Sequence, residues 1–105
     1  MIIGKCIIYL NCNWCHSLKE KRMVLKSIID KVKHKFNVSI AEVDKQDVHK
    51  TIVIGFVCAT NEKRQADKVI DKVINFIEEN TEAIIYSIER EIFWKRTRFL
   101  IITVL

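Results

Sequence analysis

The sequence predicts an α+β fold of the ferredoxin-like class, a two-layer βαββαβ sandwich in which two helices cover one face of a four-stranded antiparallel sheet. Six segments with strand or helix periodicity follow one another in the order strand, helix, strand, strand, helix, strand. The 105 residues are 50% hydrophobic and include no proline and two glycines, which suits one domain with one core. We expect that domain to span residues 1–92, followed by a C-terminal extension over 93–105. The favoured interpretation of this extension is an added edge strand, and the alternatives are a disordered apolar end or a basic–apolar membrane contact.

Residues 2–12 alternate between two faces, as a strand does. Cys6 and Leu10 fall on the face that we expect to lie under the helices. The other face of this strand carries three residues that have no predicted helix to cover them: Ile3, Ile7 and Tyr9.

A helix follows, because Ser17-Leu18-Lys19-Glu20 has the pattern of a capping box. Apolar residues then recur at helical spacing and form one buried stripe: Leu18, Leu25, Ile28, Ile29, Val32 and Phe36. Asn37 is predicted to end the helix in the left-handed conformation.

The rest of the domain shows the same kinds of strand and helix pattern. Residues 38–43 and 51–59 are predicted strands on either side of a polar turn. Thr60 or Asn61 is expected to cap the second helix, which ends at Asn80. Its apolar stripe consists of Ala66, Val69, Ile70, Val73 and Ile77. Residues 82–92 form the last predicted strand.

The net charge of +5 is concentrated in the first helix, where residues 17–36 hold seven Lys or Arg against Glu20 and Asp30. A row of cations at helical spacing can follow the phosphates of a nucleic acid. We therefore predict that one surface of this protein contacts RNA, with the ribosome or ribosomal RNA as the partner. The residues of this surface are His16, Lys19, Lys21, Arg22, Lys26 and Lys33. The simpler alternative is a solvated basic face.

The uncovered sheet face indicates that another protein chain covers it. An apolar sheet face on a domain of this size needs cover, and a second copy of the chain provides a self-complementary one. We expect a homodimer through Ile3, Ile7 and Tyr9.

Four cysteines are present, and Cys12-Asn13-Trp14-Cys15-His16 spells C-x-x-C-H. The apolar start of the chain lacks a charged segment before it and a cleavage site after it, and no stretch is long enough to cross a bilayer. We therefore expect a cytoplasmic protein without membrane contact, whose cysteines are reduced. Haem attachment, zinc binding and thioredoxin-like redox chemistry through Cys12 and Cys15 are the alternatives to two ordinary loop thiols.

Several motifs point to one family. His16 to Arg22 reads HSLKEKR, residues 36–43 read FNVSIAEV, and residues 88–92 read IEREI. These stretches resemble the YlxP-like family of small bacterial proteins, a domain of unknown function. The resemblance implies a ferredoxin-like fold and no assigned enzyme activity, and the family's genes often lie beside genes for translation factors, which hints at RNA. Cys12, Cys15 and the extension depart from the family pattern.

No pair of carboxylates, nucleophile, phosphate loop or metal-ligand set stands out, so we predict no catalytic residue, no metal, no cofactor and no small-molecule substrate. The leading interpretation is a non-enzymatic binding module with an RNA-facing basic helix. A protein-binding or structural homodimer without nucleic-acid contact is the second. A thiol-redox protein using Cys12 and Cys15 is the third.

Overall fold

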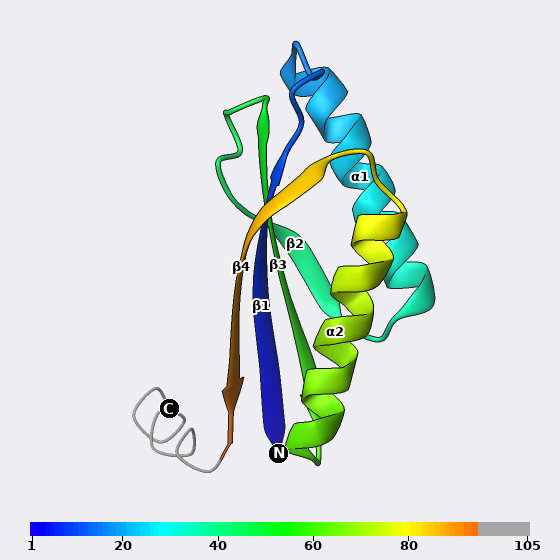
Figure 1. The fold of residues 1–105 in the computed structure, drawn as a ribbon, viewed down its shortest axis with the longest axis vertical. Coiled ribbons are helices and arrows are strands. Elements are labelled where there is room, and N and C mark those ends of the chain that lie inside the picture. Colours follow the sequence, from blue (N-terminus) through cyan, green and yellow to red (C-terminus); the bar gives the residue numbers. More distant parts are fainter. Residues whose placement is uncertain (95–105) are drawn as a thin grey trace.

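The computed structural model describes residues 1–94 and has the predicted order of elements. The elements are β1 (Ile2–Asn11), α1 (Leu18–Lys35), β2 (Ser39–Asp44), β3 (Thr51–Thr60), α2 (Lys63–Glu79) and β4 (Ile84–Phe93). The strand order is β2-β3-β1-β4, with every neighbouring pair antiparallel. Both helices lie on the same side of this sheet (Figure 1). The ferredoxin-like α+β prediction is therefore confirmed.

The core lies between the sheet and the two helices. In β1, Cys6, Ile8 and Leu10 point into it and are fully buried, while the residues between them are half-buried. The helices contribute the predicted stripes, from Leu25, Ile28 and Val32 of α1 and from Ala66, Ile70, Val73 and Ile77 of α2. Strand alternation and helical spacing thus select the same buried layer.

Gly4 lets α2 approach β1 closely. A Cβ atom at this position would lie 2.9 Å from Cys58 Sγ, 3.2 Å from Ile70 Cδ1 and 3.4 Å from Ala66 Cβ. Because contacts below about 3.4 Å crowd a well-packed core, a larger residue here would displace the helix from the sheet.

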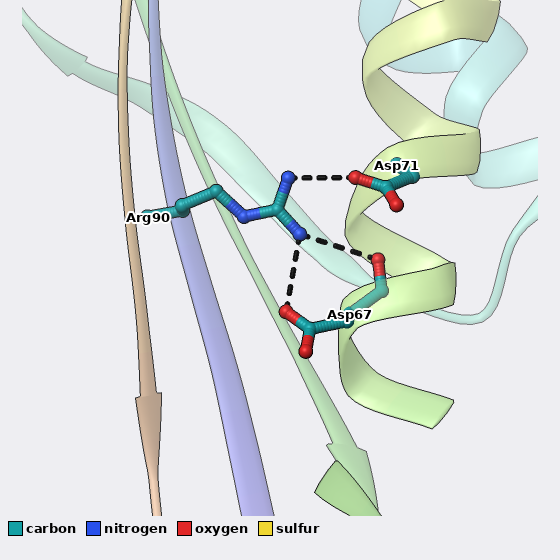
Figure 2. Close-up of polar contacts among 3 residues, drawn as sticks. All are labelled: Asp67, Asp71 and Arg90. Atoms are coloured by element: carbon teal, nitrogen blue, oxygen red, sulfur yellow. Dashed lines mark hydrogen bonds and ion pairs between the residues drawn. The ribbon is translucent and has the colours of Figure 1, made fainter. Parts of the chain in front are cut away.

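Arg90 links the edge strand β4 to α2 through polar contacts (Figure 2). Its guanidinium donates to Asp71 Oδ1 at 2.7 Å and to Asp67 Oδ1 at 3.2 Å, and it reaches the Asp67 carbonyl oxygen at 3.3 Å. The hydrogen bond to Asp71, followed by the charge of that carboxylate and of Asp67, raises the pKa of Arg90 against the opposing effect of burial. The arginine therefore stays charged, and its contacts with Asp67 and Asp71 join β4 to α2.

Two details of the helix ends differ from the prediction. Asn37 does not adopt the left-handed conformation: α1 ends at Phe36 with φ −122°, and within residues 1–94 the non-glycine residue with positive φ is Lys45, at 56°. The N-cap of α2 is Glu62, whose side chain makes no capping hydrogen bond. Thr60 instead donates its hydroxyl hydrogen bond to the Glu62 carbonyl at 2.8 Å.

The predicted edge strand of the C-terminal extension falls on residues 95–105, which lie outside the described residues. In the described part of the chain, no helix combines the length and the apolar character needed to cross a membrane.

Candidate nucleic-acid interface

Four exposed cations occupy one flank of α1, which we call the basic flank: Lys19, Arg22, Lys26 and Lys33. Lys33 lines a shallow hollow with Val38 and Ser39, so this flank faces the β2 edge of the sheet. Lys35 lies on the opposite flank, where its ammonium is 4.9 Å from the centre of the Phe76 ring of α2. The basic flank therefore lies on the side of α1 that faces away from α2.

The start of α1 is fixed by its predicted cap. Ser17 is extended, with φ −153°, and its hydroxyl oxygen accepts a hydrogen bond from the Glu20 amide at 3.1 Å. His16 precedes this cap and is exposed. Within the flank, Lys26 pairs with Asp30 at 2.5 Å, an exposed i,i+4 ion pair that offsets part of its charge.

Lys21 does not belong to this surface, so its assignment to an RNA contact is wrong. Its side chain is 1% exposed, and its ammonium donates to the carbonyl oxygens of Lys45 at 2.6 Å and Val48 at 2.7 Å. The same nitrogen lies 2.8 Å from Glu42 Oε2. That oxygen is buried and accepts no hydrogen bond from the described residues, so charge attraction rather than a well-aligned hydrogen bond joins the pair.

The β2–β3 connection is shaped to receive this ammonium. The Lys45 amide donates to Asp44 Oδ1 at 2.7 Å, and the Val48 amide donates to the Lys45 carbonyl at 3.0 Å. The positive φ of Lys45 turns the chain between these bonds. One sequence signal could have indicated the burial, because Lys21 lies four residues before Leu25 and so shares the apolar side of the helix.

Cys12 and Cys15 form a disulfide, so the expectation of four reduced thiols is wrong for this pair. Both residues are fully buried, and the Cys12 amide donates to the Lys50 carbonyl at 2.8 Å. Cys6 and Cys58 are free and buried, and burial raises the pKa of Cys6 to about 11. The disulfide closes the short loop that leads from β1 into α1.

Ile3, Ile7 and Tyr9 lie where predicted, on the sheet face that the helices leave open, and all three are half-buried. The Tyr9 ring lies 6.1 Å from the Tyr86 ring of β4. Burial, and then the Glu89 carboxylate, raise the pKa of Tyr9. Beside them, a hollow of about 280 Å³ lies over Gly55 and is lined by Ile7, Val43 and Val57.

Trp14 was missing from the predicted sites, although it is a large aromatic residue in a loop. It is 41% exposed, and Met23 of α1 is 67% exposed. In the sequence, Trp14 stands inside the C-x-x-C-H string, where the cysteines and the histidine carry the motif. In residues 1–94, no three His, Cys, Asp or Glu side chains come together as a metal site would require.

Fold and surface together define a ferredoxin-like domain with one basic helix flank and one open sheet face. The family model described as protein of unknown function (DUF503) matches residues 3–90, and the chain belongs to this family. The chain is 40% identical over 74 residues to the uncharacterized protein YlxP of Bacillus subtilis (strain 168), which covers 70% of this chain and 76% of that protein. The resemblance found in the motifs is thereby confirmed.

Two designed proteins share the fold. A de novo designed protein with a ferredoxin fold, LFR1 1, has a TM-score of 0.53 and 15% identity, covering 91% of this chain and 88% of its own. The de novo designed protein Foldit4 has a TM-score of 0.50 and 13% identity, covering 90% and 98%. At this identity the likeness describes the fold alone.

Replacing Lys21 with methionine is expected to destabilise the domain by about 3 kcal/mol, because it leaves Glu42 without its ion-pair partner and two carbonyls without their donor. Adding Glu42→Leu should recover part of this loss. The measurement is denaturant unfolding, with Lys19→Met as the exposed control, which should change stability by less than about 0.5 kcal/mol. Equal stabilities of the Lys21 and Lys19 variants would contradict the role given to Lys21.

The unreduced, denatured chain is expected to titrate two thiols, those of Cys6 and Cys58, and the reduced chain four. In the folded protein at pH 8 these two should react slowly, because a pKa of about 11 at Cys6 leaves little thiolate. A thiol reagent added before and after denaturation provides the measurement. Four thiols without reductant would show that the disulfide is absent.

Proposed function

We propose that this protein is a cytoplasmic, non-enzymatic binding module that contacts RNA, with ribosomal RNA as the candidate partner, through the basic flank and the neighbouring His16. The observation that carries the proposal is the basic flank itself, four cations on one side of α1 that all face solvent. The four cations stand at i, i+3, i+7 and i+14, and a row of cations along one side of a helix can follow a phosphate backbone.

The contrast between the helices supports this assignment. In α2 four Lys or Arg are balanced by four Asp or Glu, so that helix carries no net charge, whereas α1 holds seven Lys or Arg against Glu20 and Asp30. Arg90 further engages Asp67 and Asp71 from the sheet. The net positive charge of the helical layer therefore lies on α1, whose basic flank reaches the β2 edge at Lys33.

If the four cations of the basic flank each contact a phosphate, affinity for single-stranded RNA should fall about 50-fold between 50 and 200 mM salt. Changing Lys19, Arg22 and Lys33 together to alanine should remove most of this affinity and flatten the salt dependence. Fluorescence anisotropy of a labelled ribosomal RNA fragment provides the measurement.

The matched control changes three exposed cations of α2 to alanine: Arg64, Lys68 and Lys72. It removes the same charge from the molecule but leaves the basic flank intact. Equal losses in both triple variants would mean that net charge alone drives binding, and the basic flank would then have no special role.

A second proposal concerns the open sheet face, which we infer to be the interface of a homodimer. Ile3, Ile7 and Tyr9 line this face, which carries the hollow over Gly55 between β2, β3 and β1 and the Tyr9–Tyr86 ring pair between β1 and β4. A twofold axis through the face would let each copy offer its aromatic pair to the hollow of the other. About 800 Å² per copy would make an interface of standard size.

The homodimer predicts a sedimentation coefficient for two chains at micromolar concentration, and a monomer for Ile7→Glu. The new carboxylate would be buried without a partner at the interface. Met23→Glu, the same kind of change on the helical layer, should remain dimeric. A wild-type monomer under these conditions would refute the interface without affecting the RNA proposal.

The thiol-redox alternative has less support. Thiol–disulfide exchange requires an attacking thiolate to reach one of the sulfurs, and Cys12 and Cys15 are both fully buried. We therefore assign Cys12 and Cys15 a structural role in the loop that precedes α1.

A further inference from the structure

Trp14 forms part of a hollow on the helical layer, separate from the basic flank and from the open sheet face. We call it the Trp14 pocket. It has a volume of about 320 Å³ and lies between α1 and the connection from α2 to β4. Besides Trp14, its lining consists of Met23, Val24, Ser27 and Ile28 of α1, with Asn80, Thr81 and Glu82.

The pocket combines apolar and polar lining groups. Trp14 and Met23 supply exposed aromatic and thioether surface. The polar groups are the Ser27 hydroxyl, the Asn80 amide and the Glu82 carboxylate. The Asn80 amide nitrogen donates to the Phe76 carbonyl at 2.8 Å, which leaves its oxygen directed elsewhere. A flat ring with polar edges fits this arrangement.

The loop that carries Trp14 is fixed before any ligand arrives. The Cys12–Cys15 disulfide closes it, and the Cys15 amide donates to the Cys12 carbonyl at 3.1 Å. The Cys12 amide also binds the Lys50 carbonyl at 2.8 Å, which ties the loop to the sheet. Little ordering of the backbone is therefore needed when a ligand stacks on the indole, and this lowers the cost of binding.

One edge of the pocket, at Met23, borders the basic flank. Met23 lies four residues after Lys19 and three before Lys26, so both lysines are its neighbours on the surface of α1. A strand whose phosphates follow the basic flank would therefore carry its bases past the pocket. Glu82 disfavours a phosphate inside the pocket, and its carboxylate can accept a hydrogen bond from the amino group of a base.

We propose that the Trp14 pocket binds one unpaired nucleobase of single-stranded RNA, which stacks on the indole of Trp14. This inference rests on the proposed function, because the basic flank supplies the contact to the phosphates. It also narrows the ligand to single-stranded RNA, because a base inside a duplex is stacked on its neighbours and cannot enter the pocket. Base–aromatic stacking of this kind tolerates any sequence, because every base has a π-face.

The test uses the full chain with Trp94→Phe, which leaves Trp14 as the single tryptophan reporter. Two probes are compared at equal length and charge, an RNA hexamer and a hexamer of abasic sugar-phosphate units. The RNA should quench Trp14 fluorescence and bind at least about fivefold more tightly than the abasic strand, the lower limit for stacking one base. The abasic strand should bind without quenching.

Two variants at Trp14 separate stacking from structure. Trp14→Phe keeps an aromatic face and should retain most of the preference for RNA. Trp14→Leu keeps apolar bulk but should reduce RNA binding to the level of the abasic strand. Anisotropy of labelled strands gives both affinities, and unfolding curves check that the two variants remain folded.

Other outcomes would overturn the proposal. If Trp14→Leu binds RNA like the parent while the Lys19, Arg22 and Lys33 variant does not, the pocket is excluded and the proposed function stands. If the parent binds neither strand, both fail. Fluorescence that changes with protein concentration in the absence of RNA would place a second copy of the chain in the pocket.

Discussion

The arrangement of this domain depends on the contacts that the buried ammonium of Lys21 makes. This ammonium joins the second turn of α1 to β2 through Glu42 and to the β2–β3 connection through the carbonyls of Lys45 and Val48. Together with the apolar stripe of α1, this side chain joins α1 to the sheet, and it also holds the following connection. Because the exposed cations of α1 are fixed relative to Lys21 by helical spacing, it also sets where the basic flank points.

Much of the fold could be predicted from the sequence because it depends on local patterns. The alternation of β1 identified Cys6 and Leu10 as buried, and Ser17 capped α1 as its side chain requires. The positions of Ile3, Ile7 and Tyr9 on the open face followed from the same alternation. Patterns with a period of two or 3.6 report which side is buried, and here all the elements agreed.

The candidate site was harder to predict, because it depends on contacts between distant segments. In the sequence, Lys21 resembles any other cation, because the carbonyls that bind it come from the distant β2–β3 connection. The left-handed conformation also occurs in this connection, at Lys45, and not at Asn37. The exposure of Trp14 depends on how the Cys12–Cys15 loop meets Met23 and Asn80. A buried lysine and an exposed tryptophan both reverse the usual preferences of these residues.

Lys21 acts inside the fold while its neighbours on α1 face solvent, and NMR of the lysine ammonium groups tests this difference most directly. Protons of an exposed ammonium exchange rapidly with water, whereas those held in buried hydrogen bonds exchange slowly. We expect a persistent ammonium signal for Lys21, coupled to the carbonyls of Lys45 and Val48, and none for Lys19 or Lys33. A Lys21 ammonium that exchanges as rapidly as that of Lys19 would contradict it.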